Sequence, residues 1–164
     1  MARCLIIGCG CHGLELARAL VHRGHAVRGT TRKPARTSEI EAAGAEAFIA
    51  DPDRIASVMP ALDNVTVVCV LLGSASGERE HLDALHGSRL EMLLARLIDT
   101  TARGVVYEAR GTVSEEVLAT GAERVRRACG DSRTPFELLE TPRADGEAWL
   151  AAALAGVEML IKPR

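Results

Sequence analysis

The chain has 164 residues, of which 48% are hydrophobic, and its formal net charge at pH 7 is −2. This length and composition fit one domain with a proper buried core and exclude a disordered protein. The near balance of charge gives no reason to expect a nucleic-acid partner. No apolar run approaches the roughly 20 residues of a membrane helix, and the N-terminus lacks a signal-peptide layout. We therefore expect one cytoplasmic domain over residues 1–164, without membrane attachment.

A glycine-rich segment follows the first predicted strand. The apolar run 3–7 leads into Gly8-Cys9-Gly10-Cys11-His12-Gly13 and then into an amphipathic stretch that ends at Gly24. Between a strand and a helix, G-x-G-x-x-G indicates a dinucleotide site, because the glycines permit a tight turn, a close pyrophosphate and close helix packing. The helix N-terminus adds free N–H groups and a partial positive charge. The alternative is a structural βαβ unit with an empty crevice.

Apolar runs alternate with helical patterns along the whole chain, which predicts a parallel sheet covered on both faces. The predicted strands are 3–7, 26–29, 47–50, 65–72, 104–108 and 135–140, with 157–161 as a candidate seventh. The predicted helices are 12–23, 38–43, 53–59, a long helix around 90–98, 112–129 and 142–155. We expect a three-layer, doubly wound α/β (Rossmann) sheet in the order 3-2-1-4-5-6.

Three local signals predict where helices begin. Ser38 and Glu41 have the spacing of a capping box, and so have Thr112 and Glu115. Pro142 suits the first turn of the last helix.

The residues after the second strand distinguish NAD from NADP. NAD sites usually place Asp or Glu there to bind the ribose hydroxyls, whereas NADP sites have small polar and basic residues. This chain has Thr30-Thr31-Arg32-Lys33 and no acid until Glu39. A guanidinium can bind a 2′-phosphate through two hydrogen bonds, which a carboxylate would repel. We therefore predict NADP as the cofactor, with NAD as the alternative and a solvated loop as the other interpretation of Arg32 and Lys33.

Further candidates follow the third and fourth strands. Asp51 is placed either to accept from the adenine amino group or to cap the next helix, and Ser74 and Ser76 either close a turn or bind phosphate. Leu71, Leu72 and Gly73 end the fourth strand at the edge where ligands of such sheets lie. The predicted cofactor-binding residues are Gly8, Cys9, Gly10, Cys11, His12, Gly13, Thr30, Thr31, Arg32, Lys33, Asp51, Leu71, Leu72 and Gly73.

The five cysteines form no disulfide framework. Cys9, Cys11 and His12 lack the C-x-x-C spacing and the second cluster of a zinc site, so we expect no metal. Cys11, at a helix N-terminus, is a candidate for a reactive thiolate.

Four residues elsewhere carry alternative interpretations. His81 and His86 are either exposed loop residues or substrate-facing groups, with exposure the commoner case. Glu108, at the end of the fifth strand, is a candidate acid or base whose pKa burial would raise. Trp149 either packs on the sheet or contributes to an exposed dimer patch.

Residues 5–32, with the glycine loop, Gly24-His25-Ala26-Val27 and Thr31-Arg32, resemble the N-terminal half of extended and atypical short-chain dehydrogenases/reductases, including the NAD-dependent epimerase/dehydratase group. Residues 43–51 and Asp63-Asn64-Val65 are similar to the next βα unit of that family. The resemblance covers residues 1–109. It implies an NAD(P) site formed by Gly8, Gly10, Gly13, Arg32, Asp51 and the Leu72-Gly73 turn.

The sequence also departs from this family. The family's loop is one residue longer, G-x-x-G-x-x-G, and its catalytic Tyr and Lys form a Y-x-x-x-K pair after the fifth strand. Here Tyr107 lies within the strand, position 111 is Gly, and the only lysines are Lys33 and Lys162. We also expect no substrate-binding extension, because the chain ends shortly after the last predicted βα unit.

Two hypotheses follow, and neither names a catalytic residue. The first is an NADP(H)-binding oxidoreductase or epimerase-like protein with an unidentified small-molecule substrate, its pocket completed by a second copy or a partner subunit. The second is a non-catalytic nucleotide sensor or regulatory module. Ligand-gating domains of potassium-transport proteins open with such a loop, but they typically keep an acid after the second strand.

Overall fold

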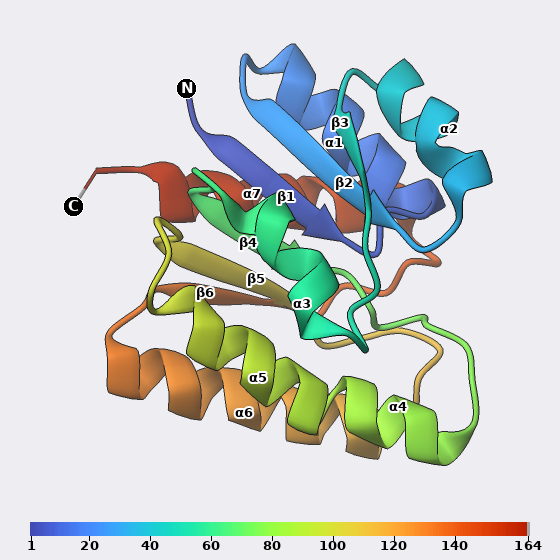
Figure 1. The fold of residues 1–164 in the computed structure, drawn as a ribbon, viewed down its shortest axis with the longest axis vertical. Coiled ribbons are helices and arrows are strands. Elements are labelled where there is room, and N and C mark those ends of the chain that lie inside the picture. The colour runs from blue at the N-terminus through green and yellow to red at the C-terminus, as the bar shows by residue number, and fades with distance from the viewer. Residues whose placement is uncertain (164) are drawn as a thin grey trace.

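A six-stranded sheet in the order β3-β2-β1-β4-β5-β6 lies at the centre of the fold, between the helices (Figure 1). A computed structural model describes residues 1–163. All neighbouring strands pair in parallel. The strands are β1 (Arg3–Ile7), β2 (Ala26–Thr31), β3 (Glu46–Ile49), β4 (Val67–Val70), β5 (Gly104–Glu108) and β6 (Phe136–Leu139). The predicted fold class and strand order are confirmed.

Helices connect successive strands and cover both faces of the sheet (Figure 1). They are α1 (Cys11–His22), α2 (Thr37–Ala42), α3 (Ile55–Val58), α4 (Arg79–Leu85), α5 (Ser88–Leu97), α6 (Glu115–Ser132) and α7 (Gly146–Ile161), with two 3₁₀ turns at Pro34–Arg36 and Met59–Leu62. Among the described residues, none of these helices combines the length and apolar character needed to cross a membrane.

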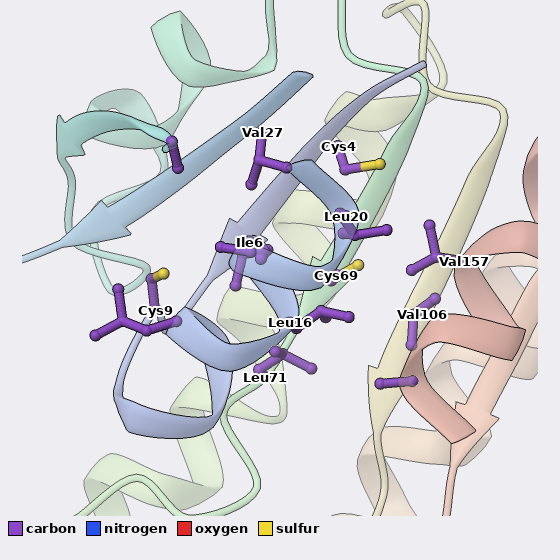
Figure 2. Close-up of a cluster of buried hydrophobic side chains, with 14 of the residues drawn as sticks. Cys4, Ile6, Cys9, Leu16, Leu20, Val27, Cys69, Leu71, Val106 and Val157 are labelled. Carbon is purple, nitrogen blue, oxygen red and sulfur yellow. The ribbon is translucent and has the colours of Figure 1, made fainter. Parts of the chain in front are cut away.

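The two faces of the sheet bury separate cores because side chains alternate along each strand. On β1, Cys4 and Ile6 point toward α1 and α7, and Figure 2 shows them together with residues of those helices. Leu5 and Ile7 point to the opposite face, where α3, α5 and α6 pack. All four side chains are fully buried. A strand that is covered on both faces reads as a continuous apolar run, as this one does.

The C-terminal segment differs from the prediction. Residues 157–161 form the end of α7 rather than a seventh strand, and Val157 is fully buried against the sheet. Periodicity cannot separate a short apolar strand from a helix segment that is buried on most sides, which explains the error. The helix also begins later than Pro142, since the Asp145 carboxylate accepts a hydrogen bond of 3.2 Å from the Ala148 N–H and caps it.

Both predicted capping boxes are wrong. Ser114 caps α6 by accepting from Val117 N–H at 3.4 Å, so Thr112 lies before the helix. Helix α2 continues directly from the 3₁₀ turn and has no side-chain cap, and Ser38 lies inside it. A capping box depends on backbone geometry just before the helix, which residue spacing alone does not fix.

Candidate functional site

The turn between β1 and α1 is shaped by its first glycine. Gly8 has a φ of +86°, and a Cβ there would lie 2.5 Å from the Leu71 carbonyl oxygen on the β4 side. The Gly10 N–H closes the turn on the Gly8 carbonyl oxygen at 2.9 Å. Glycine at position 8 is therefore required by both the backbone conformation and the neighbouring strand.

The other two glycines of the motif have different environments. A Cβ at Gly10 would meet no atom within 4 Å, so the space in front of this residue is open. A Cβ at Gly13 would lie 3.1 Å from the Gly8 carbonyl oxygen and 3.4 Å from Ile6 Cγ2, which shows how closely α1 packs on β1. The first helical bond runs from Leu14 N–H to the Gly10 oxygen. The N–H groups of the first turn therefore have no partner within the helix.

A cleft of about 270 Å³ opens at the carboxyl edge of the sheet, bounded by this turn, the end of β2 and the loops after β3 and β4. This is the edge where open α/β sheets bind ligands. Nine of the predicted residues line it, namely Gly8, Cys9, Gly10, Thr30, Thr31, Arg32, Lys33, Leu71 and Leu72. It is also lined by residues outside that prediction, namely Arg36, Ala50, Pro52, Asp53, Ser74, Ala75, Ser76, His81, Leu85 and Arg143.

Two further predicted residues lie on α1 beside the cleft rather than in its lining. Cys11 is exposed at the start of the helix. The His12 ring stands edge-on to Trp149 with centroids 5.2 Å apart. Its Nε2 donates to the Arg143 carbonyl oxygen at 3.3 Å, since a carbonyl can only accept. His12 therefore holds the loop between β6 and α7 against the first turn of α1.

Asp51 and Gly73 also lie outside the lining, and both have local structural partners. The Asp51 Oδ1 accepts from the Asp53 N–H at 2.9 Å, which closes a turn. Of its two interpretations, the one as a cap of the next helix is wrong, because Arg54 occupies the N-cap of α3 and no side chain caps that helix. A Cβ at Gly73 would lie 2.7 Å from the Arg110 carbonyl oxygen, so the loop after β5 explains why this residue is small.

Basic side chains gather where the chain leaves β2. Arg32 and Lys33 are exposed and line the cleft, and Arg36 joins them from the 3₁₀ turn that follows. The Arg36 guanidinium lies 2.9 Å from the Glu39 carboxylate, an exposed pair of small energetic value. Arg36 was not among the predicted residues because the prediction covered only residues 30–33, whereas the 3₁₀ turn Pro34–Arg36 brings this side chain to the cleft as well.

Cys9 forms part of the inner wall of the cleft and is 4% exposed. Burial raises the pKa of its thiol to about 11, against the opposing effect of Arg36 and Arg18. The neutral sulfur packs against β2, since a Cβ at Gly29 would lie 2.8 Å from it. Cys9 therefore acts as a small apolar group here.

Tyr107, the only tyrosine in the sequence, is fully buried in the core. The His86 Nε2 donates to the Leu72 carbonyl oxygen at 2.9 Å, so Nδ1 accepts from the Tyr107 hydroxyl at 2.6 Å. Burial raises the pKa of Tyr107 and lowers that of His86. His86 is 2% exposed, so its interpretation as an exposed loop residue is wrong, and both of its ring nitrogens are hydrogen-bonded within the chain, to a carbonyl and a phenol.

Glu108 is completely buried at the end of β5 and accepts four hydrogen bonds. Arg143 donates to both of its oxygens, from Nε and Nη2, at 2.8 Å each. The Trp149 indole N–H and the Gly73 N–H donate at 3.0 and 2.9 Å. With every oxygen occupied, the carboxylate has no free position for proton transfer to a substrate. Trp149 is fully buried on the sheet, as one interpretation predicted.

Helix α4 and the segment between β3 and α3 contact each other through His81 and Asp53. The His81 Nε2 lies 2.5 Å from the Asp53 Oδ2, and both residues line the cleft. His81 belongs to α4 and its side chain is 33% exposed, so its interpretation as an exposed loop residue is also wrong. Ser74 Oγ accepts from the Thr112 N–H at 3.2 Å, which ties the loop after β4 to the loop after β5. No cluster of three or more His, Cys, Asp or Glu suited to a metal occurs within residues 1–163.

The glycine turn, the open N-terminus of α1 and the cleft at the carboxyl edge define a dinucleotide-binding Rossmann domain. A family model described as NAD(P)H-binding matches residues 8–128, which spans the turn, the basic residues and most of α6. The chain belongs to this NAD(P)H-binding family. A comparison with curated proteins finds no match.

Solved structures share the fold at low sequence identity. A short-chain dehydrogenase/reductase superfamily protein from Agrobacterium tumefaciens with bound NAD has a TM-score of 0.68 and 20% identity over 84% of this chain and 48% of its own. UDP-glucuronic acid 4-epimerase from Bacillus cereus, in complex with NAD, has a TM-score of 0.67 and 14% identity over 85% and 56%. Vestitone reductase from alfalfa has a TM-score of 0.63 and 12% identity over 84% and 56%. The chain thus spans about half the length of these proteins.

Proposed function

We propose that this domain binds NADP(H) in preference to NAD(H). The observation that carries the proposal is the group of three basic side chains, Arg32, Lys33 and Arg36, which line the cleft after β2. The strand end itself, Thr30-Thr31, carries no carboxylate to grip a ribose diol. A 2′-phosphate would meet guanidinium and ammonium groups there, which favour an anion.

Calorimetry of the parent protein with NADPH and NADH tests the preference. NADPH should bind more tightly, and Arg32→Ala should lose about 10- to 100-fold of NADPH affinity, as expected for one charge-assisted contact, with little change for NADH. Arg127→Ala, at an exposed position on α6 away from the cleft, removes the same charge as a control. Equal affinities for the two cofactors in the parent would contradict the proposal.

We further propose that the domain supplies the cofactor half of an oxidoreductase or epimerase-like enzyme, cytoplasmic and completed by a second copy or a partner subunit. The support is the shared fold with a reductase and an epimerase about twice as long. A bound nicotinamide would supply hydride transfer. The Tyr107 hydroxyl and the Glu108 carboxylate are both buried and hydrogen-bonded within the chain, so neither is free to act on a substrate, and we place the acid and base in the completing subunit.

The same burial favours a second candidate, a nucleotide sensor without catalysis. One measurement distinguishes the two candidates. NADPH oxidation is followed in the presence of a panel of carbonyl compounds, together with any proteins captured with the tagged chain. Turnover supports the enzyme. Tight NADPH binding without turnover, together with a captured partner, supports the sensor.

A further inference from the structure

Arg143 is positioned by contacts that a surface arginine would not have. Its Nε and Nη2 donate in a fork to Glu108, whose carboxylate is completely buried at the end of β5. Nη2 also lies 3.4 Å from the Leu71 carbonyl oxygen, where β4 ends. The guanidinium lies 5.7 Å from the centre of the Trp149 ring. Such a two-point bond to a buried carboxylate fixes both the position and the plane of the guanidinium.

The backbone of Arg143 is fixed next to the glycine turn. Its carbonyl oxygen accepts from His12 in the first turn of α1, 131 residues earlier in the chain. Arg143 lines the same cleft as Gly8 and Gly10. The side chain therefore extends from the buried end of β5 to the wall of the cleft beside the start of α1.

One donor of Arg143 remains free within the described residues. Nε and Nη2 donate to Glu108, but Nη1 donates to none of residues 1–163, and the side chain is 21% exposed. An anion in the cleft could therefore pair with Nη1 while Nε and Nη2 stay hydrogen-bonded to the Glu108 carboxylate. Gly8 and Gly10, which precede the unpaired N–H groups at the start of α1, line the same cleft as Arg143.

We propose, resting on the proposed NADP(H) binding, that Arg143 binds the diphosphate group of the dinucleotide. The diphosphate would lie between Nη1 and the N-terminal N–H groups of α1, in the open space in front of Gly10. Glu108 acts as a positioning residue that holds the guanidinium there. The three basic residues after β2 then bind the 2′-phosphate, which is attached to C2′ of the same ribose that carries the diphosphate at C5′, so two separate basic sites select the two anionic parts of one ligand.

The test compares three ligands: NADPH, 2′-phospho-ADP-ribose, which has the diphosphate but no nicotinamide, and adenosine 2′-phosphate, which has neither. The double variant Glu108→Gln/Arg143→Met avoids leaving a buried, unpaired carboxylate, which alone would destabilise the fold. We expect this variant to lose about 10- to 100-fold in affinity for the first two ligands and to bind adenosine 2′-phosphate as the parent does. Arg32→Ala should weaken all three.

Glu91→Gln/Arg124→Met is the matched control, because it removes an ion pair between α5 and α6 with the same change of charge. Circular dichroism checks that each variant is folded, and Arg143→Lys serves as a milder variant that keeps the charge but cannot form the fork. Unchanged affinity for all three ligands in a folded variant would overturn the inference alone. A loss confined to NADPH would assign Arg143 to the nicotinamide end and also overturn it. If the parent binds none of the ligands, both this inference and the proposed function fail.

Discussion

The Tyr107 hydroxyl donates a hydrogen bond of 2.6 Å to Nδ1 of His86, and both side chains are buried between β5 and the α4–α5 region. Tyr107→Phe removes the donor and leaves a buried ring nitrogen unpaired. We expect a loss of about 1–3 kcal/mol in the free energy of unfolding, the usual result of stranding one buried polar atom. Urea denaturation measures it. Nucleotide affinity should stay unchanged, and a large loss of binding would place the hydroxyl in the ligand site instead.

The same histidine predicts a pH dependence of stability. Because burial lowers the pKa of His86, the unfolded chain binds a proton more readily than the folded protein. The stabilisation is complete above the unfolded pKa of about 6.5 and is lost as the pH falls below it toward the folded value. His86→Gln should therefore flatten the fall of stability between about pH 7.5 and about pH 5.5. His22→Gln, at an exposed position, should keep the slope of the parent, and an unchanged slope in both variants would refute the assignment.

Substitution of two glycines of α6 by alanine should change the stability of the protein in opposite directions. A Cβ at Gly121 would overlap the Tyr107 hydroxyl, whereas one at Gly130 would meet nothing within 4 Å. Gly121→Ala should lose about 1–3 kcal/mol through overpacking. Gly130→Ala should gain about 0.5–1 kcal/mol, because alanine loses less backbone entropy in a helix. Thermal unfolding of the two variants side by side checks the contrast, and equal effects would show that α6 sits farther from the tyrosine.

Substitutions of the first two glycines of the loop should affect different properties, Gly8 the stability of the fold and Gly10 the binding of the nucleotide. Gly10→Val should keep the fold, since its φ of −84° and ψ of −159° suit any residue and its surroundings are open. The isopropyl group would occupy the diphosphate space, so we expect NADPH binding to be abolished in calorimetry. Gly8→Ala should instead destabilise the protein by at least about 1–2 kcal/mol from the left-handed backbone alone. Undiminished binding by a folded Gly10→Val protein would contradict the site.

Local patterns were sufficient for the strand order and the glycine turn. The hydrogen bonds that close the turn lie within residues 8–14, so the motif alone is enough to predict it, although the Leu71 carbonyl on the β4 side adds a second reason for glycine at position 8. The wall of the cleft could not be predicted in this way. Arg143 joins it only after the chain has formed β6 and returned to the end of β4. One signal was present in the sequence: Glu108 ends a wholly apolar strand, and a carboxylate buried there needs a cation. An arginine after the next strand was the natural candidate.

Four of the five cysteines are buried, and Cys11 alone is exposed, one residue after Gly10. A maleimide dye should therefore label the native protein at a single position, without mutagenesis. That position lies at the start of α1, beside the cleft where we propose that the cofactor binds, so the fluorescence of the attached dye should change when a nucleotide binds there. Denaturant would expose the remaining thiols, and the stoichiometry of labelling would then report how many molecules have unfolded.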